Sequence, residues 1–336
     1  MIQRIIHHLF LQRHFWREAS FSEIAELYAS RMLRMLALSM ASAFLSIYLY
    51  QNGYSIQFIA LFWAAYYLFA GLVSLPLTML TAWIGPKHGI LWSNILFIPS
   101  MVAFSLLPQL GPWVLALVVV FQGASTALYT MCFNVDFSKV KSSEHAGKEL
   151  AYMNIVEKVT TGISPLIGGL LAYLLGPQVV LIIAAVIFLL AAIPLLRTVE
   201  PTLRRQRLDW RGFPWHLLRH VGVSRLAIGY DVFTSGTVWW LFTAIAIIGI
   251  HANNEVYAAN GLLLSAILFA ALGASYAYGK LIDRRRGRQL LQIALIFNSL
   301  THFARPFINT PAGVATLNIA NEAATTGYVM AYNRGF

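Results

Sequence analysis

Residues 279–288 read Gly-Lys-Leu-Ile-Asp-Arg-Arg-Arg-Gly-Arg, a basic segment between two long apolar runs. An earlier segment, Ile-Gly-Pro-Lys-His-Gly at 84–89, also lies between apolar runs. A second pair of segments, 122–134 and 321–333, repeats at nearly the same sequence offset. Identical residue types pair at Ala124 and Ala323, Thr126 and Thr325, Tyr129 and Tyr328, Met131 and Met330, and Asn134 and Asn333. Two matches at a shared offset predict an internal duplication, the alternative being a chance match between apolar helices rich in small residues.

The composition indicates a chain that lies in lipid. It is 58% hydrophobic and only 11% charged, whereas a soluble domain has about 25% charged residues. No soluble core of this size could bury so much apolar surface. The single cysteine, Cys132, cannot form an internal disulfide and has no partners for a metal site. We therefore expect an integral membrane protein without cofactor or metal, and the N-terminus shows no cleavable signal pattern.

The apolar runs predict about ten transmembrane helices, because a helix needs about 20 mostly apolar residues to cross a bilayer. Residues that break helices, such as Gly53 and the pair Gly176-Pro177, fall between the runs. Lipid tolerates only helices or closed barrels, and the alternating polarity of barrel strands is absent. The predicted spans are 31–50, 56–80, 90–108, 112–134, 151–175, 178–196, 226–250, 256–279, 289–308 and 312–333.

The basic residues predict the orientation of these spans. Lys and Arg lie before the first span and in the even-numbered gaps, whereas gaps one, three, five and seven contain none and gap nine has only Arg305 at its edge. Because Lys and Arg remain on the cytoplasmic side, we expect a cytoplasmic N-terminus in a plasma (inner) membrane. The net charge of +11 is then explained by an anionic inner leaflet rather than by a nucleic acid.

The chain divides into four predicted regions. Residues 1–26 form an N-terminal segment, in which apolar residues at helical spacing favour a helix in the cytoplasmic interface over a disordered basic tail. Residues 27–198 form a bundle of six spans, and residues 226–336 a bundle of four. The longest polar stretch, 199–225, is basic and is interpreted as the cytoplasmic linker between the two bundles.

Three motifs give the chain a resemblance to the major facilitator superfamily of secondary transporters. That family's loop signature, Gly-x-Leu-x-Asp-Arg-x-Gly-Arg, is matched by Gly279, Leu281, Asp283, Arg284, Gly287 and Arg288, with one extra arginine inserted. Gln122-Gly123 resembles its fourth-span motif, and Ser164-Pro165-Leu-Ile-Gly168-Gly169 resembles a fifth-span motif of drug/proton antiporters.

The resemblance implies an all-α bundle of two pseudo-symmetric six-helix halves around a central cavity. The chain stops after the tenth predicted span, so we expect a fragment whose second half is incomplete. Two departures from the family pattern matter. The arginine of the fourth-span motif is replaced by Val119, which argues against the usual proton-coupling chemistry, and the first-half loop has lost its acid at Gly85.

Charged residues inside the spans are candidates for function, because an unpaired charge in hydrocarbon costs several kcal/mol. Glu322 lies near the middle of the last predicted span, and Asn318 and Thr325 share its helix face, with Asn321 beside them. This stripe predicts a cavity wall that binds substrate or a proton. The alternative is a glutamate paired with a neighbouring helix, which would only hold the bundle together.

Other polar residues receive more limited interpretations. In the fourth span, Gln122 and Tyr129 lie on one face and are expected to form hydrogen bonds at the cavity wall. Glu157 and Lys158 are adjacent, so they are expected to have different partners, and structural pairing is favoured over transport chemistry. Asp231 lies one turn into the seventh span and suits a cytoplasmic gate.

The loop at 279–288 has a mechanical interpretation. Gly279 permits close approach of neighbouring spans, and Asp283 can accept charge-assisted hydrogen bonds. With Arg284, Gly287 and Arg288, these residues form a candidate conformational latch. The alternative is that the arginines only orient the protein in the membrane.

These observations lead to one main hypothesis, a monomeric secondary transporter of a small organic solute, with proton-coupled export as its extension. A membrane scaffold that binds lipid or a partner, and a membrane-embedded enzyme, are the alternatives. The chain has no Gly-x-Ser-x-Gly elbow, no His-Glu-x-x-His pair and no Gly-x-x-x-x-Gly-Lys-Ser/Thr phosphate loop. We therefore expect neither enzyme activity nor ATP-driven transport.

Overall fold

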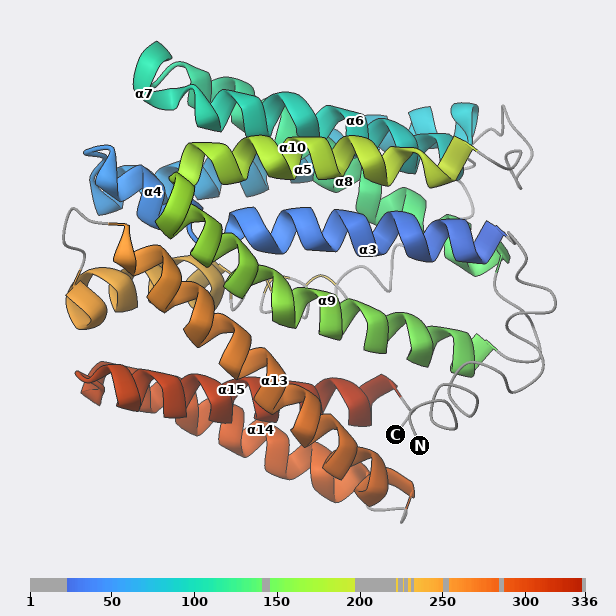
Figure 1. The fold of residues 1–336 in the computed structure, drawn as a ribbon. Coiled ribbons are helices and arrows are strands. Elements are labelled where there is room, and N and C mark those ends of the chain that lie inside the picture. Colours follow the sequence, from blue (N-terminus) through green and yellow to red (C-terminus); the bar gives the residue numbers. More distant parts are fainter. Residues whose placement is uncertain are drawn as a thin grey trace, which may run out of the picture. The chain divides into compact units, whose positions relative to one another are not determined.

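The computed structural model describes the backbone of residues 23–140, 146–196, 233–249, 254–283 and 287–333, and a few positions between 222 and 230. These residues form helices joined by short turns, with no strand among them (Figure 1). The all-α prediction is confirmed. The predicted interfacial helix at 1–16 and most of the linker at 199–225 lie outside the described residues, so both stay predictions.

The helices of the first part of the chain are α3 (Glu23–Ser42), α4 (Leu45–Gln51), α5 (Ile56–Ile84), α6 (Pro86–Ser105), α7 (Leu107–Leu110), α8 (Val114–Val140), α9 (Ala146–Leu175), α10 (Pro177–Ala192) and the 3₁₀ turn η1 (Pro194–Leu196). Those of the later part are the π-helical η2 (Thr234–Val238), α12 (Trp239–Phe242), the π-helical η3 (Thr243–Gly249), α13 (Glu255–Asp283), α14 (Gly287–Ala304), the 3₁₀ turn η4 (Arg305–Phe307) and α15 (Pro311–Asn333).

Seven spans in the described part of the chain are long and apolar enough to cross a membrane. They are Ala25–Gln51, Ile56–Ile84, Pro86–Ser105, Val114–Asp136, Glu157–Leu175, Pro177–Leu196 and Glu255–Ala274. α14 and α15 are helical where the last two spans were predicted, but they are not among these seven. The seventh predicted span is described only in part and contains the two π-helical segments.

The start of the first span was placed too late in the sequence. The apolar helix begins by Ala25 rather than at 31, so Arg31 and Arg34 lie well inside the span rather than at its end. The count of basic residues that predicts a cytoplasmic N-terminus includes both arginines as charges of the N-terminal stretch. Their true position makes them charged groups inside a membrane helix, which require partners.

The chain forms two compact units. Unit 1 comprises the described residues within Met1–Ala37, Phe62–Glu157 and Leu181–Phe213. Unit 2 comprises those within Leu38–Leu61, Lys158–Val180 and Pro214–Phe336. The helices α3, α5, α9 and α10 each contribute residues to both units. The predicted division into bundles at 27–198 and 226–336 stays a prediction.

In unit 1, α6 and α8 lie side by side along their length (Figure 1). Gly89 of α6 faces Cys132 of α8, where a larger residue would collide with the thiol. At the start of α6, Lys87 is buried and forms an ion pair of 2.8 Å with Glu26 of α3. The sequence had assigned Lys87 to a cytoplasmic gap. In the structure, this residue instead links α6 to α3 through its ion pair with Glu26.

In unit 2, α15 packs against both α13 and α14 (Figure 1). α13 also provides hydrogen-bond partners for two backbone groups of other helices, one at a helix break and one beside a proline. The Asn260 amide donates to the carbonyl of Ala43 at the break between α3 and α4. The N–H of Leu166, next to Pro165 in α9, donates to the Ser265 hydroxyl at 3.1 Å. Such partners make a broken or proline-containing helix tolerable in lipid.

The Ser-Pro-Leu-Ile-Gly-Gly motif of α9 is a packing surface of unit 2. Gly168 faces the backbone of Met40, and Gly169 faces Gly261 of α13. A side chain at Gly261 would meet the backbone of Pro165 and Gly169. Small residues allow this close contact between helix backbones, as is typical of membrane helices.

This contact yields a prediction for Gly261→Ala. The added methyl group meets backbone atoms that cannot move aside, so the variant should lose about 1–3 kcal/mol of unfolding free energy. Thermal unfolding of the purified protein in detergent would measure the loss.

Gly273→Ala is the matched control on the same helix, because a Cβ at Gly273 meets nothing within 4 Å. This control should be neutral or gain up to about 1 kcal/mol, since alanine has the higher helix propensity. Equal unfolding temperatures for the two variants would contradict the assigned contact.

Candidate functional site

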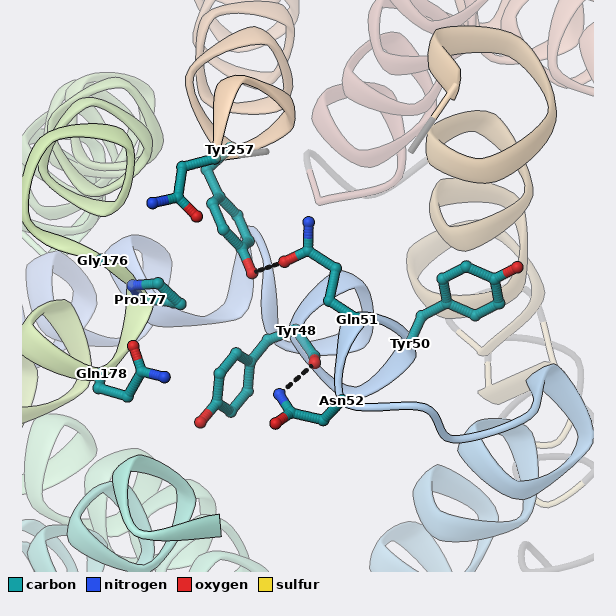
Figure 2. Close-up of a pocket in the computed structure, with 9 residues that line it drawn as sticks. Tyr48, Tyr50, Gln51, Asn52, Gly176, Pro177, Gln178 and Tyr257 are labelled. Atoms are coloured by element: carbon teal, nitrogen blue, oxygen red, sulfur yellow. Dashed lines mark hydrogen bonds between the residues drawn. The ribbon is translucent and has the colours of Figure 1, made fainter. Parts of the chain in front are cut away.

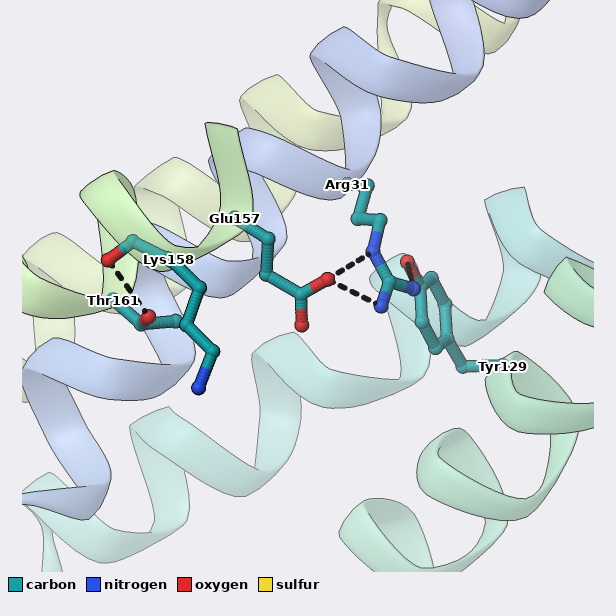
Figure 3. A network of polar contacts seen from close by, with 5 residues as sticks. All are labelled: Arg31, Tyr129, Glu157, Lys158 and Thr161. Atoms are coloured by element: carbon teal, nitrogen blue, oxygen red, sulfur yellow. Dashed lines mark hydrogen bonds and ion pairs between the residues drawn. The ribbon is translucent and has the colours of Figure 1, made fainter. Parts of the chain in front are cut away.

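Arg31 of α3 is the centre of an ionic contact within unit 1. Its Nε and Nη2 donate to Oε2 of Glu157 in α9, at 2.9 Å and 2.6 Å. Its Nη1 lies 3.5 Å from the Tyr129 hydroxyl, and its guanidinium lies over the Phe133 ring at 4.1 Å. Figure 3 shows Arg31 between Glu157 and Tyr129. The pair is partly shielded from solvent, which strengthens its electrostatic attraction.

Arg34, one turn further along α3, is almost completely buried at 2% exposure. Its guanidinium donates to Asn94 Oδ1 at 2.8 Å and to Ser125 Oγ at 3.2 Å. Aromatic rings surround it, with Tyr129 at 4.0 Å and Phe97 at 5.3 Å from the guanidinium carbon. In the described part of the chain, its hydrogen bonds go only to neutral groups. Cation–π contacts and neutral acceptors therefore hold this charge.

Together, Arg31, Arg34, Tyr129 and Glu157 form a cluster, named here the arginine cluster, that contains two cations and one carboxylate. Sequence reasoning predicted Tyr129 and Glu157 but missed both arginines. A detectable signal was present, because Arg31 and Arg34 are three residues apart and share a helix face. The positive-inside interpretation counted both arginines as cytoplasmic charges, so that signal was not used.

The other predicted residue of α8 is also buried. Gln122 is 4% exposed, and its Oε1 has no hydrogen-bond partner among the described residues. Beside it on α8, Thr126 accepts a hydrogen bond of 2.9 Å from the Tyr66 hydroxyl of α5. This face of α8 is therefore polar and buried, and its predicted place in the wall of a solute cavity stays a prediction.

In unit 2, Lys158 of α9 lies 3.3 Å from Glu322 of α15. The side chains keep 39% and 28% exposure, so the pair is only partly shielded. This contact is the pairing with a neighbouring helix that was considered for Glu322 as the alternative to a binding role. A pair of this kind can be structural, and it can also separate when the carboxylate takes up a proton.

The remaining predicted residues of α15 each contact another helix. Asn318 accepts a hydrogen bond of 2.9 Å from the Trp239 indole of α12. Asn321 accepts one of 2.7 Å from Thr301 of α14. Thr325 Oγ1 lies 3.5 Å from Asn298 Oδ1, also of α14. The polar stripe of α15 therefore bonds to at least three neighbours, including α9 through Glu322.

Glu157 and Lys158 have different partners, as their adjacent positions on a helix required. Glu157 contacts Arg31 and Lys158 contacts Glu322. Figure 3 shows the two side chains leaving α9 in different directions, with Thr161 donating to the backbone of Lys158 at 3.2 Å. Asp231 lies outside the described residues, so its gate role stays a prediction.

The candidate latch is described only by its backbone. α13 ends at Asp283 and α14 begins at Gly287, with Arg284 outside the described residues. Arg288 is exposed at the start of α14. The packing around Gly279 and the side-chain contacts of Asp283 also lie outside the description, so the latch stays a prediction. Among the described residues, no group of three His, Cys, Asp or Glu side chains could hold a metal.

Comparison with known protein families identifies the family of this chain. The family model of the Major Facilitator Superfamily matches residues 27–332. The chain therefore belongs to the Major Facilitator Superfamily. A search of curated protein sequences gave no significant match.

Solved structures of similar fold include other transporters. A peptide transporter POT in complex with sulfate has a TM-score of 0.64 at 11% identity, covering 95% of this chain and 82% of that one. A POT family transporter in complex with 5-aminolevulinic acid has a TM-score of 0.64 at 12% identity, covering 93% and 82%. A variant of the nucleoside transporter NupG has a TM-score of 0.63 at 12% identity, with the same coverage of 93% and 82%. At these identities the likeness concerns the fold alone.

The arginine cluster yields a second prediction, tested by a double-mutant cycle on Arg31→Met and Glu157→Gln. Each single change leaves a partner without its counter-ion, so each should destabilise the protein. The double change removes both charges, and the coupling energy should be about 1–3 kcal/mol. Unfolding free energies in mixed micelles would measure the cycle.

The charge swap Arg31→Glu with Glu157→Arg is the control, and it should recover part of the loss of either single reversal. Strictly additive single effects would show that the two side chains do not interact in the folded protein.

Proposed function

We propose that this chain is a secondary active transporter that moves a small organic solute by alternating access. Its membership of the Major Facilitator Superfamily and its transporter-like fold support this function. The single observation that carries the proposal is that Glu157 and Lys158, consecutive residues of α9, form ion pairs with α3 and α15. Ion pairs between helices can be repacked when a protein changes from one state to another, as a carrier with alternating states requires.

The proposed coupling ion is the proton, and the proposed direction is export. The Lys158–Glu322 pair supports this coupling, because protonation of Glu322 would remove its charge and its attraction to Lys158. α15 would then be free to change its contact with α9. The arginine that the family often has in its fourth span is replaced by Val119, so the proposed coupling relies on α15 instead.

We also propose that the protein is a monomer in the plasma (inner) membrane, with its N-terminus in the cytoplasm. The distribution of Lys and Arg between the gaps supports this orientation. The small-molecule ligands named for structures of similar fold, a peptide conjugate and 5-aminolevulinic acid, suggest the size of solute to test.

The arrangement of the acids argues against a membrane-embedded enzyme. Glu26, Glu157 and Glu322 each pair with a separate base in the described part of the chain. An enzyme acting on lipid would instead need acids or histidines that converge on one site. A scaffold that binds lipid or a partner remains the second candidate, and flux measurements separate it from a carrier.

The test uses proteoliposomes loaded with dialanine, 5-aminolevulinic acid or uridine. Counterflow of a labelled solute, together with a pH-sensitive dye in the lumen, should show solute exchange and solute-dependent proton movement. A chemical product would identify an enzyme. A protein that gives neither exchange nor product for any solute in a wider panel would be a scaffold.

Glu322→Gln yields the third prediction. The variant cannot lose or gain a proton at this position, so proton-linked flux should be abolished while solute exchange persists. Glu255→Gln is the matched control, because Glu255 is an exposed acid at the start of α13. Unchanged pH-dependent flux in Glu322→Gln would remove this residue from the mechanism.

A further inference from the structure

A cavity of about 460 Å³ lies within unit 2, at one end of its helices (Figure 2). Its walls come from the C-terminal end of α4, the turn between α9 and α10, and the first turn of α13. The lining residues are Tyr48, Tyr50, Gln51, Asn52, Gly176, Pro177, Gln178, Asn254 and Tyr257. Its volume is in the range of small-molecule sites, about 300–1,000 Å³.

The cavity joins three gaps that the sequence places on the outer side. Gln51, Gly176 and Asn254 belong to the first, fifth and seventh gaps, which contain no Lys or Arg. The structure brings these gaps together at one end of unit 2. With the predicted orientation, the cavity opens toward the external medium.

The chemistry of the lining is neutral and rich in hydrogen-bonding groups. It has no charged side chain, and it presents three phenols and four side-chain amides. A charged ligand would lose its hydration here without gaining a counter-ion. An uncharged ligand with hydroxyl or amide groups could exchange its hydrogen bonds with water for bonds to these side chains.

One buried donor of the cavity has no hydrogen-bond partner among the described residues. The Tyr257 hydroxyl donates to Gln51 Oε1, and the Asn52 amide donates to the carbonyl of Tyr48 at 2.8 Å (Figure 2). Gln51 Nε2 is buried and has no acceptor among the described residues. A buried donor without an acceptor is unfavourable, so a ligand oxygen at this position would gain binding energy.

We propose that this cavity is a binding site for an uncharged solute rich in hydroxyl and amide groups, the chemistry of a sugar or an amino-sugar derivative. The tyrosine rings offer flat apolar faces to such a solute, and the amides offer both donors and acceptors. Its residues are separate from the ion pairs of α9. Binding is therefore testable without any transport measurement.

Two sources could supply this chemistry, a free sugar and the headgroup of a glycolipid. The test places the full chain in phosphatidylcholine nanodiscs, because maltoside detergents carry a sugar headgroup and would compete. Saturation-transfer NMR measures contact with N-acetylglucosamine, and N-acetylglucosamine 6-phosphate serves as the charged comparison. A second set of nanodiscs contains digalactosyldiacylglycerol as the lipid-borne competitor.

The fourth prediction is saturation transfer to N-acetylglucosamine but not to its phosphorylated analogue. Gln51→Leu should weaken binding by about tenfold, because the buried donor is lost. Asn254→Ala should also weaken binding, because Asn254 lines the cavity. The fold should stay intact, because this side chain is exposed. Gln109→Leu is the matched control, an exposed glutamine of the third gap that does not line the cavity.

Displacement of the free sugar by the galactolipid would support the site and assign its ligand to the membrane. Unchanged transfer to the free sugar in the nanodiscs that contain the galactolipid would support a soluble ligand. Absence of transfer to N-acetylglucosamine, equal transfer in the parent and both cavity variants, or preference for the phosphorylated sugar would overturn the proposal. None of these results depends on whether the chain transports a solute.

Discussion

The structure depends on one constraint, that charges and interrupted backbone inside apolar helices must find partners within the protein. Arg31 and Glu157 meet this requirement as an ion pair, whereas Arg34 meets it through neutral acceptors and aromatic rings. Asn260 does the same for the broken helix at Ala43. Since lipid offers no hydrogen bonds, each such partner also fixes how two helices pack.

α9 makes two kinds of contact with its neighbours, close backbone packing and ion pairs. Its glycine motif holds it close to α3 and α13 within unit 2, through contacts that leave no room for a side chain. Its consecutive residues Glu157 and Lys158 instead form ion pairs, one in each unit. Backbone packing is rigid, but ion pairs can exchange partners. One helix thus contains both a fixed contact and contacts suited to change, which agrees with a carrier of the Major Facilitator Superfamily.

The sequence predicted the helices better than it predicted their partners. Helix ends were detectable because local chemistry determines them, as at Gly176, which adopts a φ of 89° before Pro177 begins α10. The partners of Lys158 and Asn318 lie far away along the chain, so no local pattern reveals them. Arg31 and Arg34 were not predicted as site residues, because the positive-inside rule, which concerns loops, was applied to them although they belong to a membrane-spanning helix.

Cys132 has a practical consequence. It is the sole cysteine of the chain, its exposed fraction is 0%, and its sulfur lies 3.1 Å from the Thr81 hydroxyl, beside Gly89. A water-soluble maleimide cannot reach a thiol enclosed in this way. Reporter cysteines introduced at the ends of the spans can therefore carry spin labels or fluorophores with the natural thiol left in place, and no background substitution needs to disturb the packing of α6 on α8.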